Sequence, residues 1–208
     1  MRKAHLLLTL FFVAGCALKA DQFLTVSLNT APLNGTAGSL DFAFSSGALS
    51  SQSATVQILN FTGAVFGGVR QTTGDVTGGP LGFAPITLNN STAYQSNDDF
   101  ESVTFGRSLS FTLDFGGPAV NSPSGGNTST SQFAFYTYGD ANGSVPVLTG
   151  DPSGLSGLIT INLNGSPSTS AVSPNLTFSA PVPEPAAIWL LATALGLLSV
   201  TRLLRRPS

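Results

Sequence analysis

Strict alternation of apolar and polar residues over 108–115 is the feature that most limits what this chain can fold into. The segment reads Ser-Leu-Ser-Phe-Thr-Leu-Asp-Phe. Successive side chains of a strand point to opposite faces, so this pattern predicts a β-strand with its Leu and Phe residues in a core and its polar residues in water. The same period of two recurs at 26–28 and 40–44, and no segment of 21–180 has a sustained helical period.

Several further short apolar runs predict an all-β domain. Glycine-rich and Asn-Gly turns separate these runs, for example at Gly78-Gly79-Pro80 and Asn142-Gly143. We therefore expect an antiparallel β-sandwich, jelly-roll-like or Ig-like, over residues 21–180. Segment 166–173 is interpreted as a loop or as the beginning of a linker. The further predicted strands are 54–61, 64–69, 85–88, 100–105, 132–138, 146–148, 158–163 and 175–178.

The N-terminal residues have the layout of a secretory signal peptide. Arg2 and Lys3 precede an apolar run over 6–14, and small residues follow it. Residues 1–20 are therefore expected to be removed by signal peptidase. Alternatively, Cys16 ends a lipoprotein-like processing box and would become a lipidated first residue.

The C-terminal residues predict a membrane span that ends in positive charge. Residues 186–201 contain no charged side chain, and an apolar helix over about 186–204 would form a short single span. Arg202, Arg205 and Arg206 place the C-terminus on the cytoplasmic side, with the body outside. Pro183 and Pro185 hold the segment before the span extended.

The ending as a whole resembles the PEP-CTERM sorting signal of Gram-negative bacteria. Val182, Pro183, Glu184 and Pro185 come first, then the apolar span, then the basic terminus, so the resemblance covers 182–208. It implies that an exosortase recognises the motif and removes the tail. The body is also similar to a group of short PEP-CTERM proteins of undefined role, in motifs such as 73–78 and 151–154.

The charge of the body disfavours a polyanionic partner. Of ten acidic residues only Glu184 lies outside 21–180, and of eight basic residues only Arg70 and Arg107 lie inside, which gives 2 − 9 = −7. A surface of this sign repels nucleic acid.

The body also lacks the residues that most enzymes use at neutral pH. His5 and Cys16 are the only histidine and cysteine, and both lie in the predicted signal peptide. No Ser-His-Asp or Cys-His arrangement and no imidazole or thiolate zinc site can form. We therefore expect a protein that is not an enzyme and holds no cofactor.

Asp98, Asp99 and Glu101 form the only tight acidic cluster. Clustered carboxylates can bind Ca²⁺, and a pair of carboxyl groups can serve as the acid and base of a glycoside hydrolase. The favoured interpretation is a solvated strand entry whose charges discourage edge pairing. Asp140 and Asn142 alternate around a glycine like the start of a calcium loop, but the favoured interpretation is an Asx-stabilised hairpin turn.

The sequence thus predicts an exported, non-enzymatic protein with a structural or adhesive role. It would be anchored in the inner membrane with its domain in the periplasm, then processed and delivered to the cell envelope or extracellular matrix. Exopolysaccharide is a further expected partner. The alternative function is a calcium-dependent carbohydrate-binding module that acts on matrix polysaccharide.

Overall fold

The computed structural model describes residues 22–47, 51–90, 96–125 and 129–180, and these form a mostly antiparallel β-sheet domain. Every strand ladder in this part of the chain is antiparallel. The expected all-β class is therefore confirmed. The strands are β1 (Gln22–Asn29), β2 (Ala37–Ser46), β3 (Thr55–Thr73), β4 (Val76–Gly78), β5 (Ile86–Asn89), β6 (Asn97–Gly116), β7 (Ser131–Tyr138), β8 (Leu155–Ile161), β9 (Pro167–Ala171) and β10 (Leu176–Ser179), with a 3₁₀ turn η1 (Ala31–Leu33) and a short helix α1 (Pro118–Asn121).

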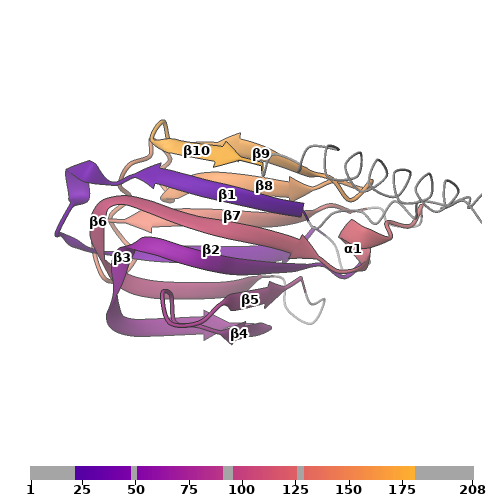
Figure 1. The fold of residues 1–208 in the computed structure, drawn as a ribbon, viewed down its shortest axis with the longest axis horizontal. Coiled ribbons are helices and arrows are strands. Elements are labelled where there is room, and N and C mark those ends of the chain that lie inside the picture. Colours follow the sequence, from indigo (N-terminus) through magenta and orange to yellow (C-terminus); the bar gives the residue numbers. More distant parts are fainter. Residues whose placement is uncertain (1–21, 48–50, 91–95, 126–128, 181–208) are drawn as a thin grey trace, which may run out of the picture.

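Two long strands, β3 and β6, organise the domain. They pair along almost their whole length and curve together around one end of the molecule (Figure 1). Glycines permit this bend, because a Cβ on Gly63 would lie 1.7 Å from the Ser108 carbonyl oxygen and one on Gly106 would lie 2.6 Å from the Gly63 oxygen. On its other edge β6 pairs with β2 through 97–104 and with β1 through 108–115.

The bent pair divides the sheet into two halves that face each other. One half has the order β10-β1-β6-β3-β5-β4, and the other has the order β3-β6-β2-β7-β8-β9. Phe111 of β6 in the first half packs on Phe42 of β2 and Phe135 of β7 in the second, at ring-centroid distances of 5.5 and 5.3 Å. The phenylalanine-rich core lies between these facing surfaces.

The expected alternation is confirmed, and some strand boundaries differ. Leu109, Phe111, Leu113 and Phe115 are all buried. The strands expected at 54–61 and 64–69 are one strand, β3, and those at 100–105 and 108–115 are one strand, β6, since glycines let each strand bend without ending. Segment 146–148 contributes only a bridge from Pro146 to Tyr138, whereas 166–173, interpreted as a loop or linker, contains strand β9.

Several sequence predictions lie outside the described residues. These are the signal peptide with Cys16, the motif Val182–Pro185, the span at 186–204 and the basic residues Arg202, Arg205 and Arg206. Within the described ranges, no helix has the length and apolar character that crossing a bilayer requires.

Candidate functional site

The acidic cluster of β6 is divided between the two faces of its strand. Asp99 and Glu101 are fully buried on the inner face, and Asn97 joins them there. Asp98 lies between Asn97 and Asp99 in sequence and points to the other face, where it accepts a 2.7 Å hydrogen bond from the Ser96 hydroxyl. The period of two that governs the apolar residues therefore also separates these carboxylates. The expected solvated strand entry is wrong for Asp99 and Glu101.

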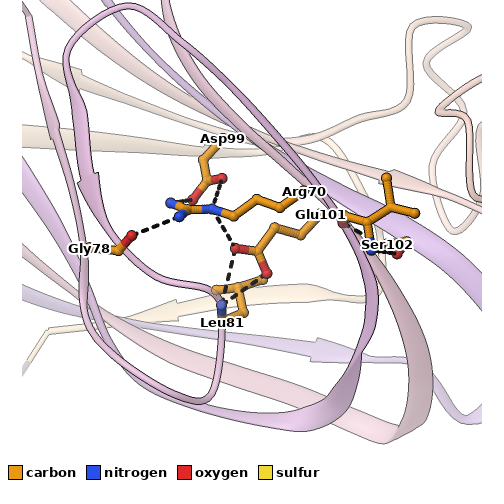
Figure 2. A network of polar contacts seen from close by, with 7 residues as sticks. Arg70, Gly78, Leu81, Asp99, Glu101 and Ser102 are labelled. Atoms are coloured by element: carbon orange, nitrogen blue, oxygen red, sulfur yellow. Dashed lines mark hydrogen bonds and ion pairs between the residues drawn. The ribbon is translucent and has the colours of Figure 1, made fainter.

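Arg70 of β3 binds both buried carboxylates. Its Nε and Nη2 atoms donate to Asp99 Oδ1 and Oδ2 at 2.8 and 3.0 Å, a bidentate arrangement, and Nε lies 3.1 Å from Glu101 Oε1 (Figure 2). The hydrogen bond to Asp99 is the main reason that the pKa of Arg70 is raised. Burial raises the pKa of Glu101 from 4.5 to about 7.

This network fastens the segment that joins β4 to β5. The backbone N–H of Leu81 donates to both oxygens of Glu101, at 3.1 and 2.9 Å, and Arg70 Nη1 donates to the Gly78 carbonyl oxygen at 2.7 Å (Figure 2). Asn97 Oδ1 accepts from the Asp75 N–H at 2.7 Å. The carboxylate oxygens that a calcium ion or a sugar would need are thus engaged by the protein itself. We interpret the network as a structural brace.

A second group of titratable residues, which the sequence reasoning missed, centres on Asp41 of β2. Asp41 lies between Phe100 of β6 and Tyr136 of β7 in the sheet. Burial, with the charges of Asp98 and Asp99, raises its pKa from 3.8 to about 7. Among the described residues, its Oδ1 is buried without a hydrogen-bond partner.

The alternation of 40–44 predicts that the Asp41 side chain faces water, but the side chain is half-buried. A turn that is distant in sequence covers it. The 140–144 turn reaches this face, because Ser39 Oγ donates to the Asp140 carbonyl oxygen at 2.8 Å and a Cβ on Gly143 would lie 2.8 Å from the Phe100 ring. Asp41 also helps to raise the pKa of Tyr136, although burial is the main cause.

Asp41→Asn is expected to stabilise the protein at pH 8 and to have no such effect in acid. A carboxyl whose pKa is higher in the folded state favours folding while protonated, and that contribution is lost as the pH rises from about 4 to about 7. The difference between 3.8 and about 7 corresponds to about 4 kcal/mol; solvent screening reduces the expected gain to about 1–2 kcal/mol. Denaturant unfolding at pH 4 and pH 8 measures it. Asp75→Asn, which removes a charge at another half-buried side chain, is the control, and an equal gain in that variant would contradict the expectation.

Asp140 forms the Asx-stabilised turn that was one of its two interpretations. Its Oδ1 accepts from the backbone N–H groups of Ser144 and Val145 at 2.9 and 3.0 Å, and its Oδ2 accepts from the Ser144 hydroxyl at 2.6 Å. The Ser144 hydroxyl is the main reason that the pKa of Asp140 is lowered. Asn142 lies exposed in the same turn. Over the described ranges, no three His, Cys, Asp or Glu residues are grouped so that they could hold a metal ion.

Phe83 is the only exposed phenylalanine among the described residues. It is 78% exposed on the segment between β4 and β5 that the Arg70 network fastens, and it stands edge-on to Phe66 at 6.4 Å. Together with Ile58 and Phe61 it lines a shallow pocket of about 230 Å³. No periodic signal in the sequence distinguishes Phe83 from a core residue.

Comparison of this chain with protein-family models, with curated proteins and with solved structures finds no match. Its function is therefore inferred from its own residues.

Proposed function

We propose that this protein is an exported, non-enzymatic structural or adhesive protein that an exosortase processes at Val182–Pro185. The observation that carries the proposal is the order of three elements in the last residues: a Pro-Glu-Pro motif, an uncharged apolar run and an arginine cluster. The last strand, β10, ends at Ser179, three residues before Val182, so only Ala180 and Pro181 separate the motif from the domain.

The use of the carboxylates supports a structural role. Asp99 and Glu101 are bound by Arg70 and Leu81, and Asp140 closes a turn. A hydrolase needs an acid and a base that face a substrate. The acidic residues considered as catalytic groups are instead buried in a brace or divided between opposite faces of β6.

We also infer that the two facing halves form a β-sandwich, closer to the jelly-roll type than to the Ig type. Ig-like sandwiches consist of two separate sheets with about seven to nine strands between them. Here ten strands fold with β3 and β6 continuing from one half into the other.

The alternative function, a calcium-dependent carbohydrate-binding module, would need calcium ligands other than the acidic cluster of β6 and Asp140. Asp98 lies on one face of β6, Asp99 and Glu101 lie on the other, and Asp140 is occupied by its own turn. No observation in the described residues favours this alternative.

Intact mass of the protein from its producing cells tests the proposal. We expect the wild-type chain to lose both its signal peptide and the residues after the motif, and to keep the latter when the exosortase is deleted. Glu184→Ala, or Pro183→Ala with Pro185→Ala, is expected to prevent the C-terminal cut. Pro181→Ala, a neighbouring substitution outside the motif, is the control. A wild-type protein that keeps its arginine terminus in cells containing the exosortase would contradict the proposal.

A further inference from the structure

Strand β9 is an end strand of the sheet that the described residues form. Within the described part of the chain it pairs only with β8, in an unbroken register from Gly157–Ala171 to Ile161–Pro167. Of the other end strands, β4 and β10 are shorter, with three and four residues. The part of β3 that ends the second half is longer, but register shifts interrupt it and it carries Arg70. β9 therefore offers the longest end edge without a register shift or a charge.

The hydrogen bonds at the two ends of the β8–β9 hairpin show which backbone groups of β9 point outward. Asn162 N donates to Ser166 O at 2.9 Å, and Val172 N donates to Ser156 O at 3.0 Å. Hydrogen-bonded and non-hydrogen-bonded pairs alternate along an antiparallel ladder. Pro167, Thr169 and Ala171 therefore belong to the non-hydrogen-bonded pairs, and their backbone groups point away from β8. The N–H groups of Thr169 and Ala171 and the carbonyls of all three residues face outward.

This edge lacks the features that usually prevent strands from pairing between molecules. Natural edge strands are blocked by charged side chains, bulges or prolines. No charged residue lies between Asp151 and Glu184, the β8–β9 register has no bulge, and residues 168–171 are exposed with small side chains. Pro167 is the one blocking residue, and it removes an N–H only at the first position of the strand.

We propose that β9 pairs antiparallel with β9 of a second copy of this chain, around a twofold axis at Thr169. In this register the Thr169 N–H of each copy donates to the Thr169 carbonyl of the other, and each Ala171 N–H donates to the opposite Pro167 carbonyl. Four backbone hydrogen bonds form. Two more, from Pro167 of each copy to the opposite Ala171 carbonyl, cannot form because proline has no N–H. Ser168 of one copy lies opposite Ser170 of the other.

A second copy is the occupant because the outward N–H and carbonyl groups of β9 are complementary to the same groups of another β9 about a twofold axis. The body of each copy carries a net charge of −7, which repels another copy over most of its surface. The β9 edge carries no charge, so two copies can approach there with the least repulsion. The contact is small, so it forms when copies are concentrated on one surface. The sheet of one molecule then continues into the sheet of its partner.

Cysteine cross-linking in the full chain tests the register, with Cys16→Ser in every variant so that each carries one cysteine. Opposite Cα atoms lie about 5.5 Å apart in a hydrogen-bonded antiparallel pair and about 4.5 Å apart in the other kind, and a disulfide spans about 4.4–6.8 Å. Thr169→Cys is expected to form a covalent dimer on mild oxidation in envelopes of the producing cells. Thr104→Cys, also exposed on a strand but away from an end edge, is the matched control and is expected to form several-fold less dimer.

A mixture of two variants fixes the direction of pairing. Ser168→Cys and Ser170→Cys are each expected to remain monomeric alone and to form a mixed dimer when both chains are present. Adding Ala171→Pro to Thr169→Cys removes two of the four hydrogen bonds and should lower the dimer yield several-fold. A Thr169→Cys dimer no more abundant than that of Thr104→Cys would overturn the proposal, as would dimers of Ser168→Cys alone. This test is independent of tail processing, because unprocessed and processed chains both contain β9.

Discussion

Replacing Arg70 by alanine is expected to destabilise the protein by about 3–5 kcal/mol, the usual cost of removing one partner from a buried ion pair. Asp99 and Glu101 have fully buried side chains, and the Arg70 side chain is only 23% exposed. Without the guanidinium, two carboxylates of the same charge would face each other in the core.

The effect of Arg70→Ala should depend on pH. The pKa of Glu101 is about 7 with Arg70 present, and Arg70 is one of the groups that lower it. Removing Arg70 therefore raises this pKa further. Because a raised pKa in the folded state penalises the ionised form, the destabilisation should be largest above pH 7 and smaller in acid.

Denaturant unfolding followed by far-ultraviolet circular dichroism measures the effect, and Arg107→Ala is the matched control. Arg107 is the only other basic residue of the body and is exposed, so its loss should change stability by less than about 0.5 kcal/mol. Combining Arg70→Ala with Glu101→Gln should cost less than the sum of the single changes, since the second removes a charge that the first left unpaired. Equal effects of Arg70→Ala and Arg107→Ala would show that the network does not stabilise the fold.

The fold class follows from the sequence because one physical signal, the period of two, operates wherever one face of a strand is buried. Residues 108–115 and 40–44 carry that signal, and their Leu and Phe side chains are buried. The continuity of β3 and β6 could not be read in the same way. The glycines at 63 and 106 look like turn residues in the sequence, but they allow two paired strands to bend together and continue.

The brace was missed because its members are far apart in the chain. Asp99 and Glu101 are separated from Arg70 by 29 and 31 positions, and their pairing depends on the β3–β6 register, in which Arg70 lies opposite Glu101. One signal was present in the sequence: Asp99 and Glu101 share the phase of Val103 and Phe105, so alternation alone assigns both carboxylates to the inner face. β9 was missed because Pro167–Ala171 contains no large apolar residue and is exposed, so it has no alternation to detect.

Phe111→Ala is expected to destabilise the protein by about 3–5 kcal/mol, as is typical when a buried aromatic side chain is removed. Phe111 is 1% exposed, and its ring makes edge contacts with Phe42 and Phe135 from the opposite half of the sheet. Its loss would leave a cavity between the two halves, because neither bent half can close the space without moving the β3–β6 pair. Phe83→Ala removes the same atoms from a side chain that is 78% exposed and should change stability by less than about 0.5 kcal/mol.

The comparison between these two phenylalanines distinguishes a packed double layer from a single open sheet. In an open sheet, an apolar side chain on β6 would contact only neighbouring strands, and its removal would cost mainly the transfer of its surface to water, about 1.5–3 kcal/mol. In the packed arrangement the cavity adds to that cost. Phe111→Leu should then recover about half of the loss, because leucine fills part of the space between Phe42 and Phe135. A loss for Phe111→Ala close to that of Phe83→Ala, measured by the midpoint of denaturant unfolding at unchanged slope, would mean that the two halves do not pack through this ring.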